Sequence, residues 1–94
     1  MTPKVHDLKI APKYMAAQIA GIKNFEIRKN DRDFEVGDQL RLREWADGGY
    51  TGNELSVYVT YITDYQQQSG YVVLGTKSLR KTSENLLQVA AALA

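Results

Sequence analysis

The residues best suited to chemistry lie close together between positions 21 and 34. The alternating run Phe25-Glu26-Ile27-Arg28 predicts a β-strand that places Glu26 and Arg28 side by side on one face. Lys23 comes just before, at the junction between an expected helix and this strand. Two cations and one carboxylate in this arrangement can hold an acceptor-rich ligand, and the planar fork of arginine suits a phosphate or the edge of a base.

The same spacing has a plainer interpretation. Glu and Arg two positions apart on a strand are common, and such a pair on the surface contributes only about 0 to 1 kcal/mol. From spacing alone the surface ion pair is the favoured interpretation, and the binding site remains the alternative.

A second carboxylate, Glu44, conflicts with its own strand. Alternation from Leu40 and Leu42 points Glu44 inward and places Trp45 on the opposite face. Burying an unpaired carboxylate is costly, so a β-bulge or a strand end at Arg43 would resolve the conflict. Otherwise Glu44 is the second carboxylate of a cleft.

The sequence offers few residues for metal binding, phosphate-loop binding or serine catalysis. The chain has no cysteine, and His6 is its single histidine. The run Asp31-x-Asp33-x-Glu35 is similar to the start of a calcium loop, but its glycine comes one place late, at Gly37, and its twelfth position is Leu42. No glycine-rich phosphate loop and no serine on an elbow motif is present. Neither a metal nor another cofactor is expected.

The elements that must position these residues are short. We expect a helix over Lys13–Ala20 between Pro12 and Gly21, and strands over Val5–Ile10, Phe25–Lys29, Leu40 to Trp45, Leu55–Ile62 and Tyr71–Thr76. Five strands and one early helix do not suit a bundle or a doubly wound sheet. A small, partly closed α+β barrel is the economical solution, because it hides strand edges.

The middle of the chain combines an expected loop with the strand that has the longest apolar pattern. Residues 47–53 are expected to form a loop around Tyr50, because they are rich in glycine and other turn formers. In the strand that follows, alternation puts Val57, Val59 and Tyr61 on one face, with Thr60 and Ile62 on the other.

The end of the chain has a different character. Ser83 can cap a helix with one apolar stripe, made of Leu86, Leu87, Ala90, Ala91 and Leu93. We therefore expect a barrel domain over residues 1–78 and a C-terminal helix or tail over 79–94. The stripe either packs on the barrel or forms a dimer contact, so both a monomer and a homodimer remain open.

Size and charge narrow the partners. At 94 residues the chain is expected to be one cytoplasmic domain without a membrane segment. Residues 1–32 hold seven basic and three acidic side chains, a net charge of +4. Residues 33–64 hold two basic and seven acidic side chains (−5), and residues 65–94 hold three basic side chains and one acidic side chain (+2). This split suits a small anionic ligand or a short nucleic acid better than a long duplex, which needs about 6 to 10 phosphate contacts.

Aromatic side chains gather in the second half of the sequence, as Trp45, Tyr50, Tyr58, Tyr61, Tyr65 and Tyr71. Some are expected near the mouth of the barrel, where stacking of a base on a ring contributes about 1 to 3 kcal/mol. The alternative is that they fill half-buried strand faces.

Three motifs carry a family resemblance: Gly21-x-Lys23-x-Phe25-Glu26-x-Arg28, Asn30-Asp31-Arg32-Asp33-Phe34 and Val36-Gly37-Asp38-x-Leu40. Together with Glu44-Trp45 and the run from Gly70 to Gly75, they make residues 5 to 76 similar to a small bacterial and phage family. That family is named only as a domain of unknown function and sits in the ASCH group of PUA-like barrels. The C-terminal helix lies outside the resemblance.

The resemblance implies a function. The superfamily is associated with RNA, modified nucleotides and coactivator-type proteins, which implies RNA or a small nucleotide-like ligand held in a cleft by Lys23, Glu26 and Arg28. The candidate ligand-binding residues are these three together with Lys29, Asn30, Arg32 and Trp45.

One ASCH branch suggests catalysis. It contains amidohydrolases of a modified cytidine that use a lysine, a threonine two positions before an arginine, and a distant glutamate. Lys23 and Arg28 match, but Glu26 occupies the threonine position. A carboxylate there cannot be the hydroxyl nucleophile, although it can act as a base for water. The candidate catalytic residues are therefore Lys23, Glu26 and Glu44.

Three functions follow from these patterns. A nucleotide-binding or RNA-binding module ranks first. A hydrolase of a modified nucleoside needs a carboxylate with a raised pKa in a closed pocket. A phage-derived protein-interaction factor that uses the C-terminal helix predicts a large exposed apolar patch and no pocket.

Overall fold

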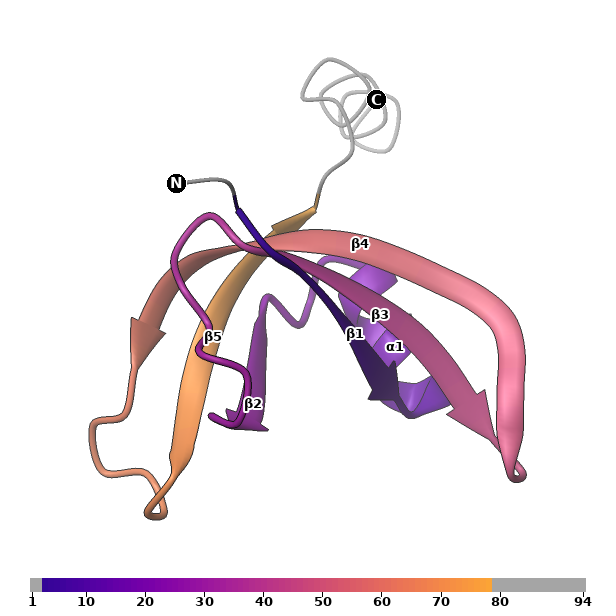
Figure 1. Ribbon diagram of the computed structural model, residues 1–94. Helices are drawn as coiled ribbons and strands as arrows, with labels where there is room; N and C mark the ends of the chain where they lie inside the picture. The colour runs from indigo at the N-terminus through magenta and orange to yellow at the C-terminus, as the bar shows by residue number, and fades with distance from the viewer. Residues whose placement is uncertain (1–2, 79–94) are drawn as a thin grey trace.

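The computed structural model describes residues 3–78 of the 94-residue chain (Figure 1). Its elements, in chain order, are β1 (Val5–Ile10), α1 (Pro12–Ile19), β2 (Phe25–Lys29), β3 (Gln39–Ala46), β4 (Gly49–Thr63) and β5 (Tyr71–Ser78). The expected helix over residues 79–94 falls outside the described residues. Within residues 3–78, no helix has the length and apolar character needed to cross a bilayer.

The five strands form one mixed sheet in the order β1-β3-β4-β5-β2. The β1–β3 pair is parallel, and the other three pairs are antiparallel. In Figure 1 the sheet arches into a half-barrel, and α1 lies beneath the arch. The expectation of a small, partly closed α+β barrel is confirmed at this level. Since β1 and β2 are the two outer strands, the open side of the half-barrel lies between them.

The core fills the concave side of the sheet. Its buried apolar side chains are Leu8, Ile10, Met15, Phe34, Leu40, Leu42, Val57, Val59, Val72 and Leu74. The strand members are two positions apart along each strand, as a sheet with one covered face requires. The helix contributes Met15, which is 1% exposed, and the connection between β2 and β3 contributes Phe34.

A β-bulge at Thr60 changes the face of β4. Val59 pairs with Thr76 and Tyr61 pairs with Gly75, so Thr60 is the extra residue on β4. Beyond the bulge Tyr61 is 66% exposed, while Ile62 packs against the core. The prediction that Tyr61 shares the buried face of Val59 is therefore wrong, because the bulge shifts the alternation by one residue.

The β3–β4 connection is much shorter than expected. Ala46 pairs with Gly49, so the turn consists of Asp47 and Gly48 alone, with φ of +53° and +81°. Two successive residues with positive φ form the type I′ turn that matches strand twist in a hairpin. The expected loop over residues 47–53 is wrong beyond Gly48, since residues 49–53 belong to β4.

Helix α1 positions the residues that precede β2. Pro12 occupies its first turn, and its buried face carries Met15 and Gln18. The helix ends at Ile19, one residue before the expected Ala20, and the chain turns at Gly21, whose φ is +76°. The N–H of Ile22 donates to the carbonyl of Ala17 at 3.0 Å. This reversal brings the chain directly from the helix into β2.

Candidate functional site

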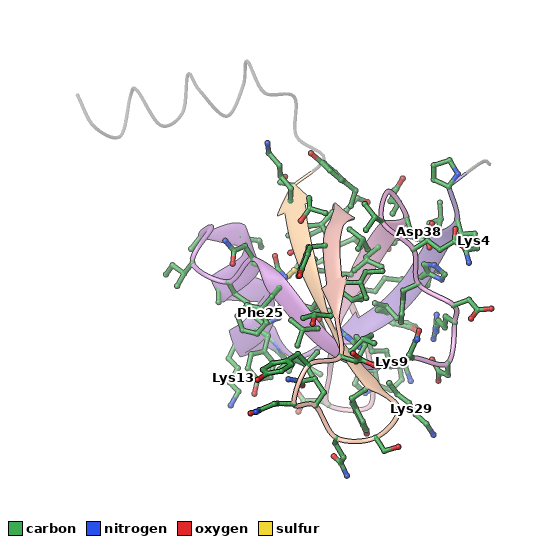
Figure 2. The ribbon with its side chains drawn as sticks, turned by 90° about the vertical axis from the view of Figure 1, so that its left-hand side faces the viewer. Lys4, Lys9, Lys13, Phe25, Lys29 and Asp38 are labelled. Atoms are coloured by element: carbon green, nitrogen blue, oxygen red, sulfur yellow. The ribbon has the colours of Figure 1, made fainter. Side chains whose placement is uncertain are left out.

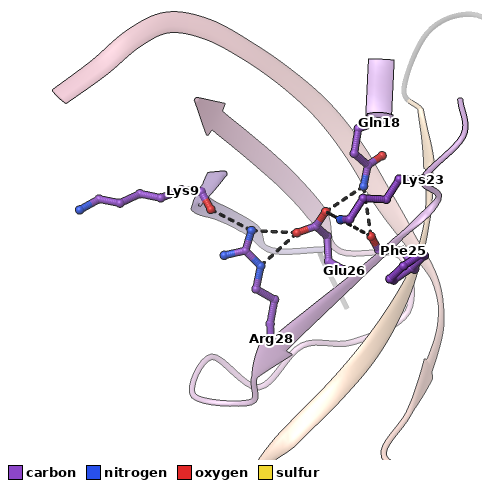
Figure 3. Close-up of polar contacts among 6 residues, drawn as sticks. All are labelled: Lys9, Gln18, Lys23, Phe25, Glu26 and Arg28. Atoms are coloured by element: carbon purple, nitrogen blue, oxygen red, sulfur yellow. Dashed lines mark hydrogen bonds and ion pairs between the residues drawn. The ribbon is translucent and has the colours of Figure 1, made fainter. Parts of the chain in front are cut away.

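Glu26 is the centre of the site (Figure 3). It lies on the inner face of β2 and is 3% exposed. Its Oε1 accepts hydrogen bonds from Nε and Nη2 of Arg28, at 3.1 and 2.8 Å. Its Oε2 accepts from Nε2 of Gln18 at 2.9 Å and from Nζ of Lys23. Four N–H donors from three side chains therefore saturate one buried carboxylate.

These donors decide the ionisation of Glu26. Burial by itself raises the pKa of the carboxyl group, but the hydrogen bonds from Lys23, Arg28 and Gln18 and the charge of Arg28 outweigh it. The pKa of Glu26 is therefore held below its ordinary value. The interpretation as a surface ion pair is wrong, because the carboxylate is buried while the two cations remain partly accessible.

The two cations are also tied to main-chain carbonyl groups. Nζ of Lys23 donates to the carbonyl of Phe25 at 2.7 Å, and Nη2 of Arg28 donates to that of Lys9 at 2.8 Å. Within residues 3–78, Nη1 of Arg28 and the third N–H of Lys23 have no hydrogen-bond partner. The cluster thus keeps spare donors after its internal bonds are made.

A cleft of about 440 Å³ opens beside these donors. It is lined by Lys9, Ile10, Ala11, Tyr14, Lys23, Phe25, Glu26, Ile27 and Arg28. Its walls come from the end of β1, the start of α1 and the edge of β2. The volume falls in the usual range for small-ligand sites, and the ammonium of Lys23 lies 5.0 Å from the Phe25 ring and 5.7 Å from the Tyr14 ring.

Arginine side chains bridge the open side of the half-barrel. Arg28 reaches the carbonyl of Lys9, and Nη1 of Arg32 donates to the carbonyl of Asp7 at 2.6 Å. Both acceptors belong to β1, the outer strand opposite β2. We call these two hydrogen bonds the arginine seam.

The remaining predicted ligand residues do not line the cleft. Lys29 and Asn30 are exposed at the end of β2, where the N–H of Asn30 donates to the carbonyl of Gly70 at 2.8 Å. Arg32 belongs to the arginine seam. Trp45 lies on the β3–β4 hairpin, where its ring is 3.8 Å from Nζ of Lys9. Figure 2 labels Lys9, Lys13 and Lys29 towards one end of the molecule and Lys4 with Asp38 towards the other.

Glu44 lies outside the cleft, at an irregularity in the sheet. The β3–β4 register shifts between Arg43 and Trp45, at the expected position but not through an extra residue in β3. The extra residues are on β4, and two of them hold the carboxylate: Thr51 Oγ1 and Asn53 Nδ2 donate to Oε1 of Glu44 at 2.8 and 3.0 Å. Glu44 therefore shapes the hairpin and is not the second carboxylate of the cleft.

Sequence reasoning missed several residues of the site, among them Gln18, Tyr14 and Lys9. Gln18 follows Met15 by three positions on the buried face of α1, and a polar residue at such a position is the signal that could have revealed it. Tyr14 and Lys9 gave no such signal, because only the approach of β1 and α1 to the edge of β2 brings them to the cleft.

A second buried carboxylate, that of Asp38, lies away from the cleft. Nε2 of His6 is 2.8 Å from Oδ2 of Asp38, which is 2% exposed. The main-chain N–H groups of Lys4 and Glu35 also donate to this carboxylate, at 3.1 and 3.0 Å. Burial raises the pKa of Asp38, but the hydrogen bonds from His6 and the two N–H groups outweigh it, so the pKa lies below its ordinary value. In residues 3–78 no three His, Asp or Glu side chains gather as a cation site.

Two comparisons place the chain among known proteins. It is 41% identical over 64 residues to a protein of Escherichia phage P2 described as an uncharacterized 12.9 kDa protein in the GpA 3′ region. The match covers 68% of this chain and 59% of the phage protein. Residues 5–76 match the family described as Domain of unknown function (DUF3850). The match covers β1 to β4, most of β5 and the whole cleft, and the chain belongs to this family.

Proposed function

We propose that the chain is a nucleotide-binding or single-stranded-RNA-binding domain of the ASCH group of PUA-like barrels. The observation that carries the proposal is the pair of spare donors, Nη1 of Arg28 and one N–H of Lys23, at an open cleft with aromatic walls. Such donors suit the oxygens of a phosphate or of a base carbonyl.

The charge of the cluster supports an acceptor-rich ligand. Glu26 neutralises one of the two cations, which leaves a net charge of +1 beside the cleft. Because its oxygens already accept four hydrogen bonds, Glu26 orients Lys23 and Arg28 and leaves recognition to them. The rings of Tyr14 and Phe25 offer flat apolar surfaces for a base.

Binding is favoured over hydrolysis by the state of Glu26. A general base for water needs a free lone pair and a pKa near the working pH. Glu26 has its lone pairs occupied and its pKa lowered, and its cleft is open to solvent. The protein-interaction hypothesis depends on residues 79–94, outside the described part of the chain.

A thermal-shift screen of nucleosides, modified nucleosides, nucleotides and short RNA oligomers tests the proposal. A ligand at a hundredfold excess over its Kd stabilises by about 2.7 kcal/mol, which raises Tm by roughly 10 to 20 °C for a domain of this size. The test variant Lys23→Met/Glu26→Gln/Arg28→Met removes the whole cluster without leaving a buried charge unpaired.

Lys77→Ala is the matched control. Both variants lower the net charge by one, and Lys77 is an exposed residue of β5 outside the cleft. A shift that is kept in the control and lost in the cluster variant supports the proposal. Absence of any shift with wild type, or the same shift in all three proteins, would overturn it.

A further inference from the structure

Two aromatic rings contact each other on the β3–β4 hairpin. Trp45 and Tyr50 are cross-strand partners, and their rings meet edge to face with centroids 4.9 Å apart. The two-residue turn over Asp47 and Gly48 fixes this pairing. Tyr50 is 46% exposed. We call this pair the hairpin platform.

One cation lies over each ring of the hairpin platform. Nζ of Lys9 lies 3.8 Å from the centroid of the Trp45 ring, and the guanidinium carbon of Arg43 lies 3.9 Å from that of Tyr50. Arg43 shares the carboxylate of Glu54, whereas Lys9 has no carboxylate partner within residues 3–78. The platform therefore combines ring surface with positive charge.

Lys9 connects the hairpin platform to the cleft. Its main-chain carbonyl accepts the hydrogen bond from Arg28, and its ammonium lies over Trp45. Figure 3 shows its side chain extending away from Glu26. In the parallel β1–β3 pair, Ile10 is the partner of Glu44, so the end of β1 lies directly beside the strand that carries Trp45. One residue thus touches both regions.

We propose that the hairpin platform is a second subsite, which stacks a base of a single-stranded nucleic acid whose neighbouring nucleotide occupies the cleft. The inference rests on the proposed function and deepens it: the ligand is an oligonucleotide. Rings beside cations are how proteins hold successive bases of a single strand, and this stacking tolerates any sequence. Lys9, placed between the two subsites, faces the phosphate that joins the two nucleotides.

The sequence supplies its own probe, because Trp45 is the sole tryptophan of the chain. Its fluorescence is recorded while wild type is titrated with uridine 5′-monophosphate or with an RNA octamer of uridine. We expect the octamer to quench Trp45 and to bind more tightly than the monophosphate. Tyr50→Leu should reduce the ratio of octamer to monophosphate affinity about fivefold or more, as expected for a lost stacking contact.

Tyr65→Leu is the control. Tyr65 is 75% exposed and follows the far end of β4, opposite the hairpin in Figure 1, so the affinity ratio should stay at its wild-type value. The second subsite would be overturned if the octamer binds without changing Trp45 emission, or if its affinity does not exceed that of the monophosphate. Neither result would contradict the cleft as a ligand site.

The proposed function fails in a different way. If the octamer quenches Trp45 as strongly in Lys23→Met/Glu26→Gln/Arg28→Met as in wild type, the cleft is overturned as the ligand site. The hairpin platform would then still be supported as a binding site. If wild type binds neither the octamer nor the monophosphate, both proposals are overturned.

Discussion

Arg28 holds Glu26 through one oxygen, with Nε and Nη2 at 3.1 and 2.8 Å from Oε1. The other oxygen is left to Gln18 and Lys23. The carboxylate of Glu26 thus joins a helix, a strand and the turn between them. It stabilises the fold and also orients the cations of the cleft. Its loss should therefore affect folding and binding together.

Glu26→Gln should lower the free energy of unfolding by about 1 to 3 kcal/mol. The amide keeps the shape but removes the negative charge, and its NH₂ group faces donors that then lack an acceptor. Urea unfolding measures the change. Glu54→Gln is the matched control, because Glu54 also accepts two hydrogen bonds from one arginine, Arg41, but is exposed. An equal loss in both variants would contradict a special role for burial at Glu26.

Stability should fall in acid. The folded-state pKa of Glu26 and of Asp38 lies below the ordinary values of 4.5 and 3.8. A depressed pKa contributes stability above the unfolded-state value, and that stability is lost as the pH falls through the folded-state value. Urea midpoints from pH 7 down to pH 3 should decrease below about pH 4.5. Glu26→Gln and Asp38→Asn should each make the urea midpoint depend less on pH. If either variant loses stability in acid as steeply as wild type, its carboxylate is not a source of the pH dependence.

Gly75→Ala should destabilise the sheet by about 1 to 3 kcal/mol, the usual cost of overpacking. A Cβ at Gly75 would lie 3.0 Å from Oγ1 of Thr60 and 3.3 Å from Cβ of Tyr61. Gly49→Ala is the control, since a Cβ there meets nothing within 4 Å. Adding Thr60→Ala to Gly75→Ala should recover part of the loss in thermal unfolding. No recovery would mean that the bulge does not set the need for glycine.

Thr76→Val should raise the free energy of unfolding by about 1 kcal/mol. Thr76 is 7% exposed, and within the described residues its hydroxyl group has no hydrogen-bond partner. Replacing a buried, unpaired hydroxyl group by a methyl group removes a desolvation cost. Thr51→Val is the comparison: the Thr51 hydroxyl donates to Glu44, so its removal should bring no gain. A destabilised Thr76→Val protein would reveal a partner for this hydroxyl group.

Strands with uninterrupted alternation were predictable. Val5–Ile10 and Phe25–Lys29 have the expected bounds, because each depends only on its own pattern of apolar and polar residues. The bulge at Thr60 was not predictable, since it depends on the glycine that faces it from β5. The two-residue hairpin turn was hidden by the glycines that follow it.

The candidate site also has features that the sequence predicts and features that it does not. Alternation predicted that Glu26 and Arg28 share a face, and the helix end at Gly21 predicted that Lys23 lies near them. The burial of Glu26 could not be read from the strand, because α1 covers that face and supplies Gln18. The cleft itself exists only where β1 approaches β2, and no pattern within either strand reports that approach.

The arginine seam has a mechanical consequence. Neighbouring strands in the sheet are joined by ladders of main-chain hydrogen bonds, but the open side is spanned by the side chains of Arg28 and Arg32, which end on β1. An arginine side chain changes its reach by rotating about single bonds. The distance between β1 and β2 can therefore vary without loss of a main-chain hydrogen bond between paired strands. The rim of the half-barrel therefore depends on these two side-chain contacts, and a ligand bound at Nη1 of Arg28 would contact the same guanidinium group that reaches β1 through Nη2.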